Sequence, residues 1–246
     1  MQKENPIGYL KLLNNETSFS RNDLKNAMCQ YGVEISVSNF KVVLQKLLEE
    51  CQIVRVGRNA YCVANENVQN YNYQYSELAT AVAMKIEDKF PYLDFTILEL
   101  IQLNEFVNHQ LAHNVVFVSV EEDLGEYVFQ ELKEHYMGKV LINPTPEIYH
   151  QYWSDNMIVI QKLVSEAPSG RKIKWHTRLE KMLIDLYMDI LLKNIISQAE
   201  IPTIYEQGFS KYGVDESCLF RYAKRRGADK KIKNFISEKT NIELRG

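Results

Sequence analysis

The sequence has few of the residues that mark several enzyme classes. It has only ten glycines in 246 residues, and none forms a GxSxG nucleophile turn, a Walker loop or a glycine-rich dinucleotide turn. Its four cysteines include no CxxC pair that would indicate a zinc knuckle or disulfide framework: Cys29, Cys51, Cys62 and Cys218. We therefore expect free thiols, no metal, no cofactor and no catalytic residues.

Long apolar runs are also missing. Nothing approaches the roughly 20 consecutive apolar residues of a membrane-spanning helix, and the N-terminal stretch MQKENPIGYL lacks the apolar core of a signal peptide. Hydrophobic residues make up 46% and charged residues 25% of the 246 residues, which suits one large globular domain or two small ones. We expect a cytoplasmic protein without a membrane partner.

The net charge of −3 is unevenly distributed. Residues 1–64 contain 8 Lys and Arg against 6 Asp and Glu, a net of +2, and the remainder contains 21 against 26, a net of −5. Within that acidic remainder, residues 221–233 carry seven cations and the single anion Asp229. A mildly basic N-terminal region and a basic patch near the C-terminus favour a partner that carries phosphate groups.

Three helical patterns occupy the N-terminal region. Residues 6–14 predict a first helix with Pro6 in its first turn. Ser20, with Asp23 three positions later, predicts a capping box that opens a second helix. A third helix is expected from near Ser38, because the following apolar residues recur with a helical period: Phe40, Val43, Leu44, Leu47 and Leu48.

Residues 49–63, EECQIVRVGRNAYCV, follow the third helix directly and alternate like a β-hairpin with a turn at Gly57. Helices followed by a two-stranded ribbon predict a winged helix-turn-helix, whose third helix enters the major groove and whose wing contacts phosphates. The predicted DNA-binding residues are Ser38, Asn39, Lys41, Gln45, Lys46, Arg55, Arg58 and Asn59. The alternative is a winged helix that mediates only protein contacts.

A polar, asparagine-rich stretch at residues 65–74 predicts a linker between domains 1–67 and 75–246. Beyond it, helical patterns alternate with strand-like runs at residues 95–100, 115–120, 139–142 and 157–162. We predict a mixed α/β (α+β) fold. An N-terminal winged helix-turn-helix precedes a larger α/β domain with a small sheet and a helical C-terminus.

A long apolar helix is expected over residues 177–192. Thr177 and Glu180 have the spacing of a capping box, which predicts where this helix opens. Lys181 and Asp185, one turn apart, are expected to form an exposed ion pair on its outer face. Each of these residues therefore has a role in folding, and none is needed for catalysis.

Residues 216–235 are expected to be helical and basic. Helical spacing places Arg221, Lys224 and Arg225 on one face, and Arg226 follows directly. Folding does not require such a cationic strip. It is either a solvated face or a second basic patch that meets DNA or an acidic partner.

Two histidines four residues apart, His109 and His113, could share a helix face and hold zinc. Gln110, however, stands where the HExxH motif has glutamate, and no third ligand is evident. We interpret the segment Asn104 to His113 as a loop whose polar side chains satisfy backbone groups.

A nuclease would need an aspartate and a Glu-x-Lys motif on neighbouring strands to hold magnesium. Asp94 precedes a predicted strand, but the two Glu-x-Lys motifs at residues 87–89 and 131–133 fall in predicted helices. The absence of a complete catalytic arrangement favours a binding protein over an enzyme.

Several short segments share an order with a known family. Besides the N-terminal winged helix they are residues 103–110 (LNEFVNHQ), 117–123 (FVSVEED), 164–168 (VSEAP), 177–186 (TRLEKMLIDL) and 221–227 (RYAKRRG). In this order, over nearly the whole chain, they resemble the AbiEi-type antitoxins of bacterial type IV toxin-antitoxin systems. The resemblance implies a transcriptional autorepressor that binds operator repeats, and a larger domain that counteracts a nucleotidyltransferase toxin encoded beside it.

We therefore expect a regulator of double-stranded operator DNA that is functionally linked to a nucleotidyltransferase toxin and has no enzymatic activity. Direct contact with the toxin and dimer formation on DNA are left open. Two alternatives remain. One is a metal-dependent nuclease or other phosphate-handling enzyme, and the other is a plain winged-helix repressor with a ligand-sensing second domain.

Overall fold

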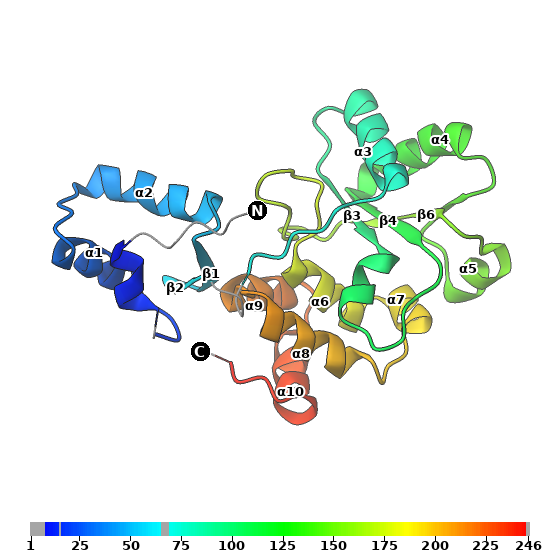
Figure 1. Cartoon of the computed structure of the whole chain (residues 1–246). Helices are drawn as coiled ribbons and strands as arrows, with labels where there is room; N and C mark the ends of the chain where they lie inside the picture. Colours follow the sequence, from blue (N-terminus) through cyan, green and yellow to red (C-terminus); the bar gives the residue numbers. More distant parts are fainter. Residues whose placement is uncertain (1–7, 15, 65–68, 245–246) are drawn as a thin grey trace. The chain divides into compact units, whose positions relative to one another are not determined.

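The computed structural model describes residues 8–14, 16–64 and 69–244, which fold into a mixed α/β protein with small sheets and a helical C-terminus (Figure 1). The chain divides into two compact units. Unit 1 comprises Met1–Tyr71, Gln207–Leu219 and Glu243–Gly246, and unit 2 comprises Asn72–Glu206 and Phe220–Ile242. The mixed α/β class expected from the sequence is confirmed.

The return of Gln207–Leu219 to unit 1 was not anticipated from the sequence. Residues 65–68 of the expected linker lie outside the described residues. Further along that stretch, Gln69 forms a parallel bridge with Tyr212, and its carbonyl accepts a hydrogen bond from Gly213 N at 3.0 Å. Gln69 is therefore paired within unit 1, whereas residues 72–74 of the expected linker belong to unit 2.

The first helix expected from the sequence is present in unit 1 as the 3-10 helix η1 (Gly8–Leu13), and Pro6 lies outside the described residues. The capping box is confirmed. Ser20 Oγ accepts from Asp23 N, and Asp23 accepts from Ser20 N at 2.8 Å. The remaining elements match expectation: α1 (Arg21–Gln30), α2 (Val37–Glu49), β1 (Ile53–Gly57) and β2 (Ala60–Val63).

The core of unit 1 forms where the apolar faces of η1, α1 and α2 meet one face of the hairpin, which contributes Ile53, Tyr61 and Val63. The opposite hairpin face is also buried and carries Val54, Val56 and Cys62. Strands buried on both faces cannot show the simple polar alternation of a half-exposed strand. The hairpin is therefore packed on both sides.

A four-stranded sheet forms the centre of unit 2, and all four strands match those expected. They are β3 (Phe95–Glu99), β4 (Val115–Val120), β5 (Val140–Ile142) and β6 (Met157–Lys162), in the order β3-β4-β6-β5. The three strands β4, β6 and β5 run parallel, and β3 is antiparallel to β4.

Two layers of helices cover this sheet. On one side, α3 (Glu77–Lys89) and α4 (Gly125–His135) bury a cluster with the apolar side chains of Val116, Val118 and Ile158 (Figure 1). On the other side lie α6 (Leu179–Met188) and α7 (Ile190–Ile195) (Figure 1). The short elements η2 (Leu100–Glu105), η3 (Glu122–Leu124) and α5 (Pro146–Tyr152) complete the connections.

The buried carboxylate of Glu99 holds α3 at the end of β3. Glu99 accepts from Ser76 N at 2.8 Å, from Ser76 Oγ at 2.6 Å and from Asn114 Nδ2 at 2.6 Å. Ser76 also caps α3 by accepting from Ala79 N. These bonds satisfy a charge that is fully removed from solvent, so Glu99 has a structural role.

The single helix expected over residues 177–192 is wrong. Thr177 makes no cap, and its Oγ1 is buried without a partner, while Glu180 pairs with Arg178 at 2.8 Å. The helix stops at Asp189, whose side chain accepts from Leu192 N and opens α7. In place of the cap, the backbone N–H of Thr177 donates to Tyr75 OH at 2.9 Å, a contact between segments far apart in the sequence.

Residues 216–235 are helical, as expected, but they belong to two helices. After α8 (Ile201–Lys211), the chain forms α9 (Glu216–Arg225) and α10 (Asp229–Lys239). Gly227, with a φ of +64°, separates the last two helices, since this left-handed conformation ends a helix at little cost for glycine. Across the residues that the structure describes, every helix is too short or too polar to cross a bilayer.

Candidate functional site

In unit 1, α2 presents a polar face on the side opposite its buried residues. Ser36 caps this helix by accepting from Asn39 N, and Phe40, Leu44 and Leu47 anchor it in the core. Outside lie five residues predicted to contact DNA, all of them exposed: Ser38, Asn39, Lys41, Gln45 and Lys46. The face is therefore available to a partner.

Three of these side chains have partners nearby in the sequence. Ser38 Oγ lies within hydrogen-bond distance of Ser36 Oγ, at 3.1 Å. Gln45 Nε2 donates to Glu49 Oε1 at 2.9 Å, and Lys46 Nζ lies 3.6 Å from Glu50 Oε1. Lys41, by contrast, has no ion-pair or hydrogen-bond partner among the described residues. Because all these groups are exposed, a ligand can replace their contacts at small cost.

The hairpin turn exposes Arg58 and Asn59 between the two strands. Asn59 has a φ of +57°, the left-handed conformation expected for this turn. Its Oδ1 accepts from Arg21 N at 3.2 Å, so Asn59 also links the turn to the start of α1. Arg58 has no hydrogen-bond or ion-pair partner within the part of the chain that the structure covers.

Arg55 has different surroundings from Arg58. Its Nε donates to Gly57 O at 3.0 Å and lies 3.4 Å from Asp215 Oδ2, whose side chain is only 5% exposed. Asp215 in turn accepts from Cys218 N in the first turn of α9. Arg55 thus ties the hairpin to the Gln207–Leu219 segment of its own unit.

In unit 2, Lys181 and Asp185 were expected to form an exposed pair, and this is wrong. Both side chains are almost fully buried, and Lys181 Nζ lies 2.6 Å from Asp185 Oδ2. The reason is that every residue of α6 from Leu179 to Leu186 is buried, so the helix has no solvated side there.

The buried pair is part of a larger network. Tyr222 OH donates to Asp185 Oδ1 at 2.8 Å, and Arg226 NH1 lies 3.5 Å from the same oxygen. Lys181 Nζ also donates to Ser119 Oγ of β4 at 3.4 Å. Burial and the Asp185 charge raise the pKa of the Tyr222 hydroxyl, which keeps it protonated as a donor. The apolar pattern on all sides of α6 was the sequence signal for this network.

The cations of the basic strip near the C-terminus differ in their exposure to solvent. Arg221, Lys224 and Arg225 are exposed, and Arg225 pairs with Glu166. Arg226 is directed inward to the Asp185 carboxylate, and only 18% of its side chain is exposed. Arg226 therefore has a folding role, although the sequence grouped it with the exposed strip.

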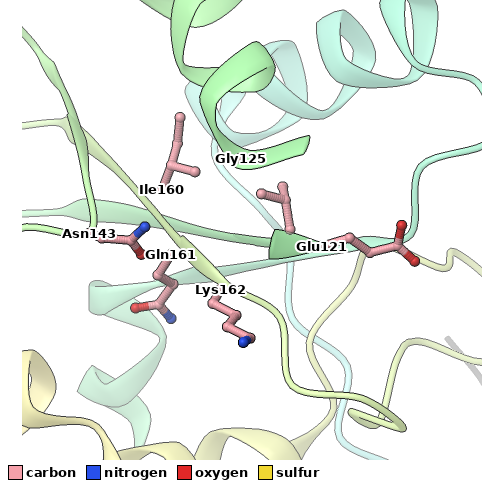
Figure 2. Close-up of a pocket in the computed structure, with 7 residues that line it drawn as sticks. Glu121, Gly125, Asn143, Ile160, Gln161 and Lys162 are labelled. Atoms are coloured by element: carbon pink, nitrogen blue, oxygen red, sulfur yellow. The ribbon is translucent and has the colours of Figure 1, made fainter. Parts of the chain in front are cut away.

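A small hollow of about 170 Å³ lies at the carboxyl ends of the parallel strands. It is lined mainly by residues at or just beyond the ends of β4, β5 and β6, the edge at which ligands bind in open α/β sheets. Figure 2 shows Glu121 directed away from Asn143, Gln161 and Lys162. The polar groups of the hollow do not converge on one point.

Residues 106–113 form a loop, as interpreted from the sequence, while Asn104 and Glu105 are the last residues of η2. Asn104 closes it in both directions, donating to Leu111 O at 3.0 Å and accepting from Leu111 N at 2.6 Å. His109 contacts Glu200 at 3.0 Å, whereas His113 lies 3.6 Å from Asp155, so the histidines have separate partners. The hydrogen bond from His109 lowers the pKa of Glu200.

Residues 87–89 lie in α3 and residues 131–133 in α4, as the sequence predicted. Asp94 lies directly before β3. Within residues 8–14, 16–64 and 69–244, no three His, Cys, Asp or Glu side chains come together as a metal site would require.

The chain belongs to DUF6577, a family of unknown function, whose sequence pattern matches residues 39–242. Its structure is similar to the crystal structure of the RV2827C protein from Mycobacterium tuberculosis, with 8% sequence identity and a TM-score of 0.34. That similarity covers 96% of this chain and 81% of the mycobacterial chain. A comparison with curated proteins found no match.

Proposed function

We propose that this protein is a DNA-binding transcriptional autorepressor that also acts as an antitoxin. In this proposal, η1, α1, α2 and the β1–β2 hairpin act as a winged helix-turn-helix, with α2 in the major groove and the hairpin as the wing. Unit 2 counteracts a nucleotidyltransferase toxin encoded beside the protein.

One observation carries the DNA-binding part of the proposal. The outer face of α2 holds exposed hydrogen-bonding and cationic side chains, Ser38, Lys41 and Gln45, while its inner face is anchored in the core of unit 1. A helix held in this way can present its side chains rigidly to base edges. The free cation Arg58 at the hairpin tip suits a contact with a neighbouring phosphate.

The antitoxin part rests on the resemblance to AbiEi-type antitoxins. Of the segments that carry it, residues 177–186 supply the buried pair of Lys181 and Asp185, and residues 221–227 supply Tyr222 and Arg226, which contact Asp185. Two segments far apart in the sequence thus meet in one network of unit 2. This supports their having a joint role in holding the larger domain together.

The first test compares binding with cleavage. A gel-shift assay uses the DNA directly upstream of the protein's own coding sequence, and a parallel assay follows nicking of supercoiled plasmid with magnesium or manganese. We expect a specific shift and no nicking. Nicking that depends on the metal would instead favour the nuclease alternative.

Two substitutions test the assigned face. Arg58→Ala should weaken specific and nonspecific binding by similar factors and lower the salt slope by about one unit, because a wing cation contacts phosphate. Gln45→Ala should relax the preference at one operator position, at a cost on the order of 1 to 3 kcal/mol, because an amide can pair with adenine. Lys133→Ala, which removes an exposed cation from α4 of unit 2, is the control.

The antitoxin role is tested by survival. Cells that express the neighbouring nucleotidyltransferase gene should recover growth when the full chain is co-expressed, with immunoblots to confirm equal protein levels. Absence of such a gene, or of rescue, would favour a plain repressor with a ligand-sensing second domain. The hollow at the carboxyl ends of β4, β5 and β6 is the observation that supports this second candidate.

A further inference from the structure

The outer face of α2 contains one apolar side chain that the proposed function has not used. Val42 is 68% exposed, although it lies in the middle of a well-anchored helix. It follows Ser38 by four residues and precedes Gln45 by three, so helical geometry places it on the same face as both. Val42 thus lies at the centre of the face assigned to base contacts.

Neither helix stability nor core packing accounts for valine at this position. A β-branched side chain loses rotamer freedom in a helix and is less favourable there than alanine or lysine. The core contacts of α2 are made by Phe40, Leu44 and Leu47 on the other side. An exposed apolar group surrounded by polar ones, on a face with a free cation at Lys41, suits a partner with both negative charge and an apolar group.

Double-stranded DNA has both properties in its major groove. Among the four bases only thymine presents a methyl group there, at its C5 position, and aliphatic side chains contact it. We propose that Val42 reads the C5 methyl group of a thymine in the operator, next to the bases contacted by Ser38 and Gln45. The inference rests on the proposed DNA-binding function and adds a specificity residue to it.

The same helix offers a matched control. Val37, in the first turn of α2, is 69% exposed, nearly the same as Val42. Five residues separate the two, which at about 100° per residue turns their side chains about 140° apart. Val37→Ala therefore makes the same chemical change on the same helix, but away from the centre of the face.

The experiment uses the full chain and a duplex made from the footprint of the protein on its own upstream DNA. A second duplex carries deoxyuridine in place of every thymidine, which removes the C5 methyl groups and leaves the pairing intact. Dissociation constants are measured for both duplexes at one salt concentration. The ratio of the two constants reports how much the methyl groups contribute.

For the unchanged protein we expect binding to weaken about fourfold for each methyl group that Val42 contacts, the effect of burying one such carbon. Val42→Ala should lower the ratio of the two dissociation constants by that factor relative to the unchanged protein. Val37→Ala should keep the full ratio. Any effect of deoxyuridine on DNA shape is the same for all three proteins and cancels in this comparison.

Equal binding of the unchanged protein to both duplexes would overturn the role of Val42. The same conclusion would follow if Val42→Ala had the same ratio of dissociation constants as the unchanged protein, or if Val37→Ala lost it. If Val42→Ala loses helix content by circular dichroism, Val42→Thr replaces it and should give an intermediate ratio. A protein partner on this face would leave DNA binding insensitive to Val42. Failure to bind either duplex would contradict the proposed function itself, whereas insensitive binding contradicts only this inference.

Discussion

Two lysine–carboxylate pairs with the same helical spacing have opposite surroundings in the two units. In unit 1, Lys46 and Glu50 are separated by 3.6 Å, with 68% and 42% of their side chains exposed. In unit 2, Lys181 and Asp185 are separated by 2.6 Å, with 2% and 3% exposed. The comparison teaches that a spacing of four residues predicts the contact but not its energy, because energy depends on solvent exposure.

The buried pair depends on its other partners, while the exposed pair does not. Asp185 accepts hydrogen bonds from Lys181 and Tyr222 and lies beside Arg226. A charge removed from water needs such contacts to offset its lost hydration, so deleting one of them leaves the others uncompensated. Lys46 and Glu50 are exposed, so solvent stabilises their charges.

The largest expected effect comes from Asp185→Ala. It should lower the free energy of unfolding by about 3–5 kcal/mol, because it leaves the Lys181 charge buried without its counterion. Both tryptophans of the chain, Trp153 and Trp175, belong to unit 2, so their fluorescence during urea unfolding reports this unit.

The control is Glu50→Ala, for which circular dichroism should show a loss of less than about 1 kcal/mol. The double change Lys181→Met with Asp185→Leu should cost less than Asp185→Ala alone, since it removes both charges. Equal effects of Asp185→Ala and Glu50→Ala would show that burial does not distinguish the pairs.

Alkaline pH should also act mainly on unit 2. Burial raises the pKa of Tyr75 from 10.0 to about 12, and the pKa values of Tyr73, Tyr205 and Tyr222 are raised as well. Because the folded pKa is the higher one, the stability that Tyr75 contributes is fully present below pH 10 and is lost as the pH rises to about 12.

The measurement is the free energy of unfolding from tryptophan fluorescence, from neutral pH to about pH 12. For Tyr75 the loss should be roughly 3 kcal/mol, since two pKa units correspond to that energy. Tyr75→Phe should lower stability at neutral pH but reduce its dependence on alkaline pH. An unchanged dependence would mean that Tyr75 does not titrate in this range.

Tyr222→Phe should have an intermediate effect. It removes the hydroxyl that donates to Asp185 but keeps the ring, so we expect a loss of about 1.5–3 kcal/mol, typical of a hydrogen bond to a charged group. In Asp185→Ala the same substitution should cost much less, because the acceptor is already gone. Additive losses in the double variant would contradict the network.

The smallest effects concern the two capping patterns. Ser20→Ala should destabilise α1 by about 1 kcal/mol, because Ser20 accepts a hydrogen bond from Asp23 N. Thr177→Val should be neutral or stabilising, because the Thr177 hydroxyl is buried without a partner. The free energy of unfolding is measured by circular dichroism for Ser20→Ala and by tryptophan fluorescence for Thr177→Val. A loss above about 1 kcal/mol for Thr177→Val would show that its hydroxyl has a hydrogen-bond partner.

Much of the local structure could be predicted from the sequence. The capping box at Ser20, the hairpin turn at Asn59 and the four strands of the sheet depend on hydrogen bonds and apolar patterns between near neighbours. In these places short-range preferences and tertiary packing agree, so the local pattern was sufficient. All five predicted residues of the α2 face are likewise exposed, because the helical period of the apolar residues determines which side is buried.

Only the tertiary structure decided which charged side chains are buried. It brings Tyr222 and Arg226 to Asp185 from 37 positions or more along the chain, and it pairs Arg55 with Asp215. It also divides the expected helix of residues 177–192 at Asp189 and leaves Thr177 without a cap. The physical reason is that the energy of a polar group depends on its desolvation and on partners from distant segments, and neither is encoded in the spacing of neighbouring residues.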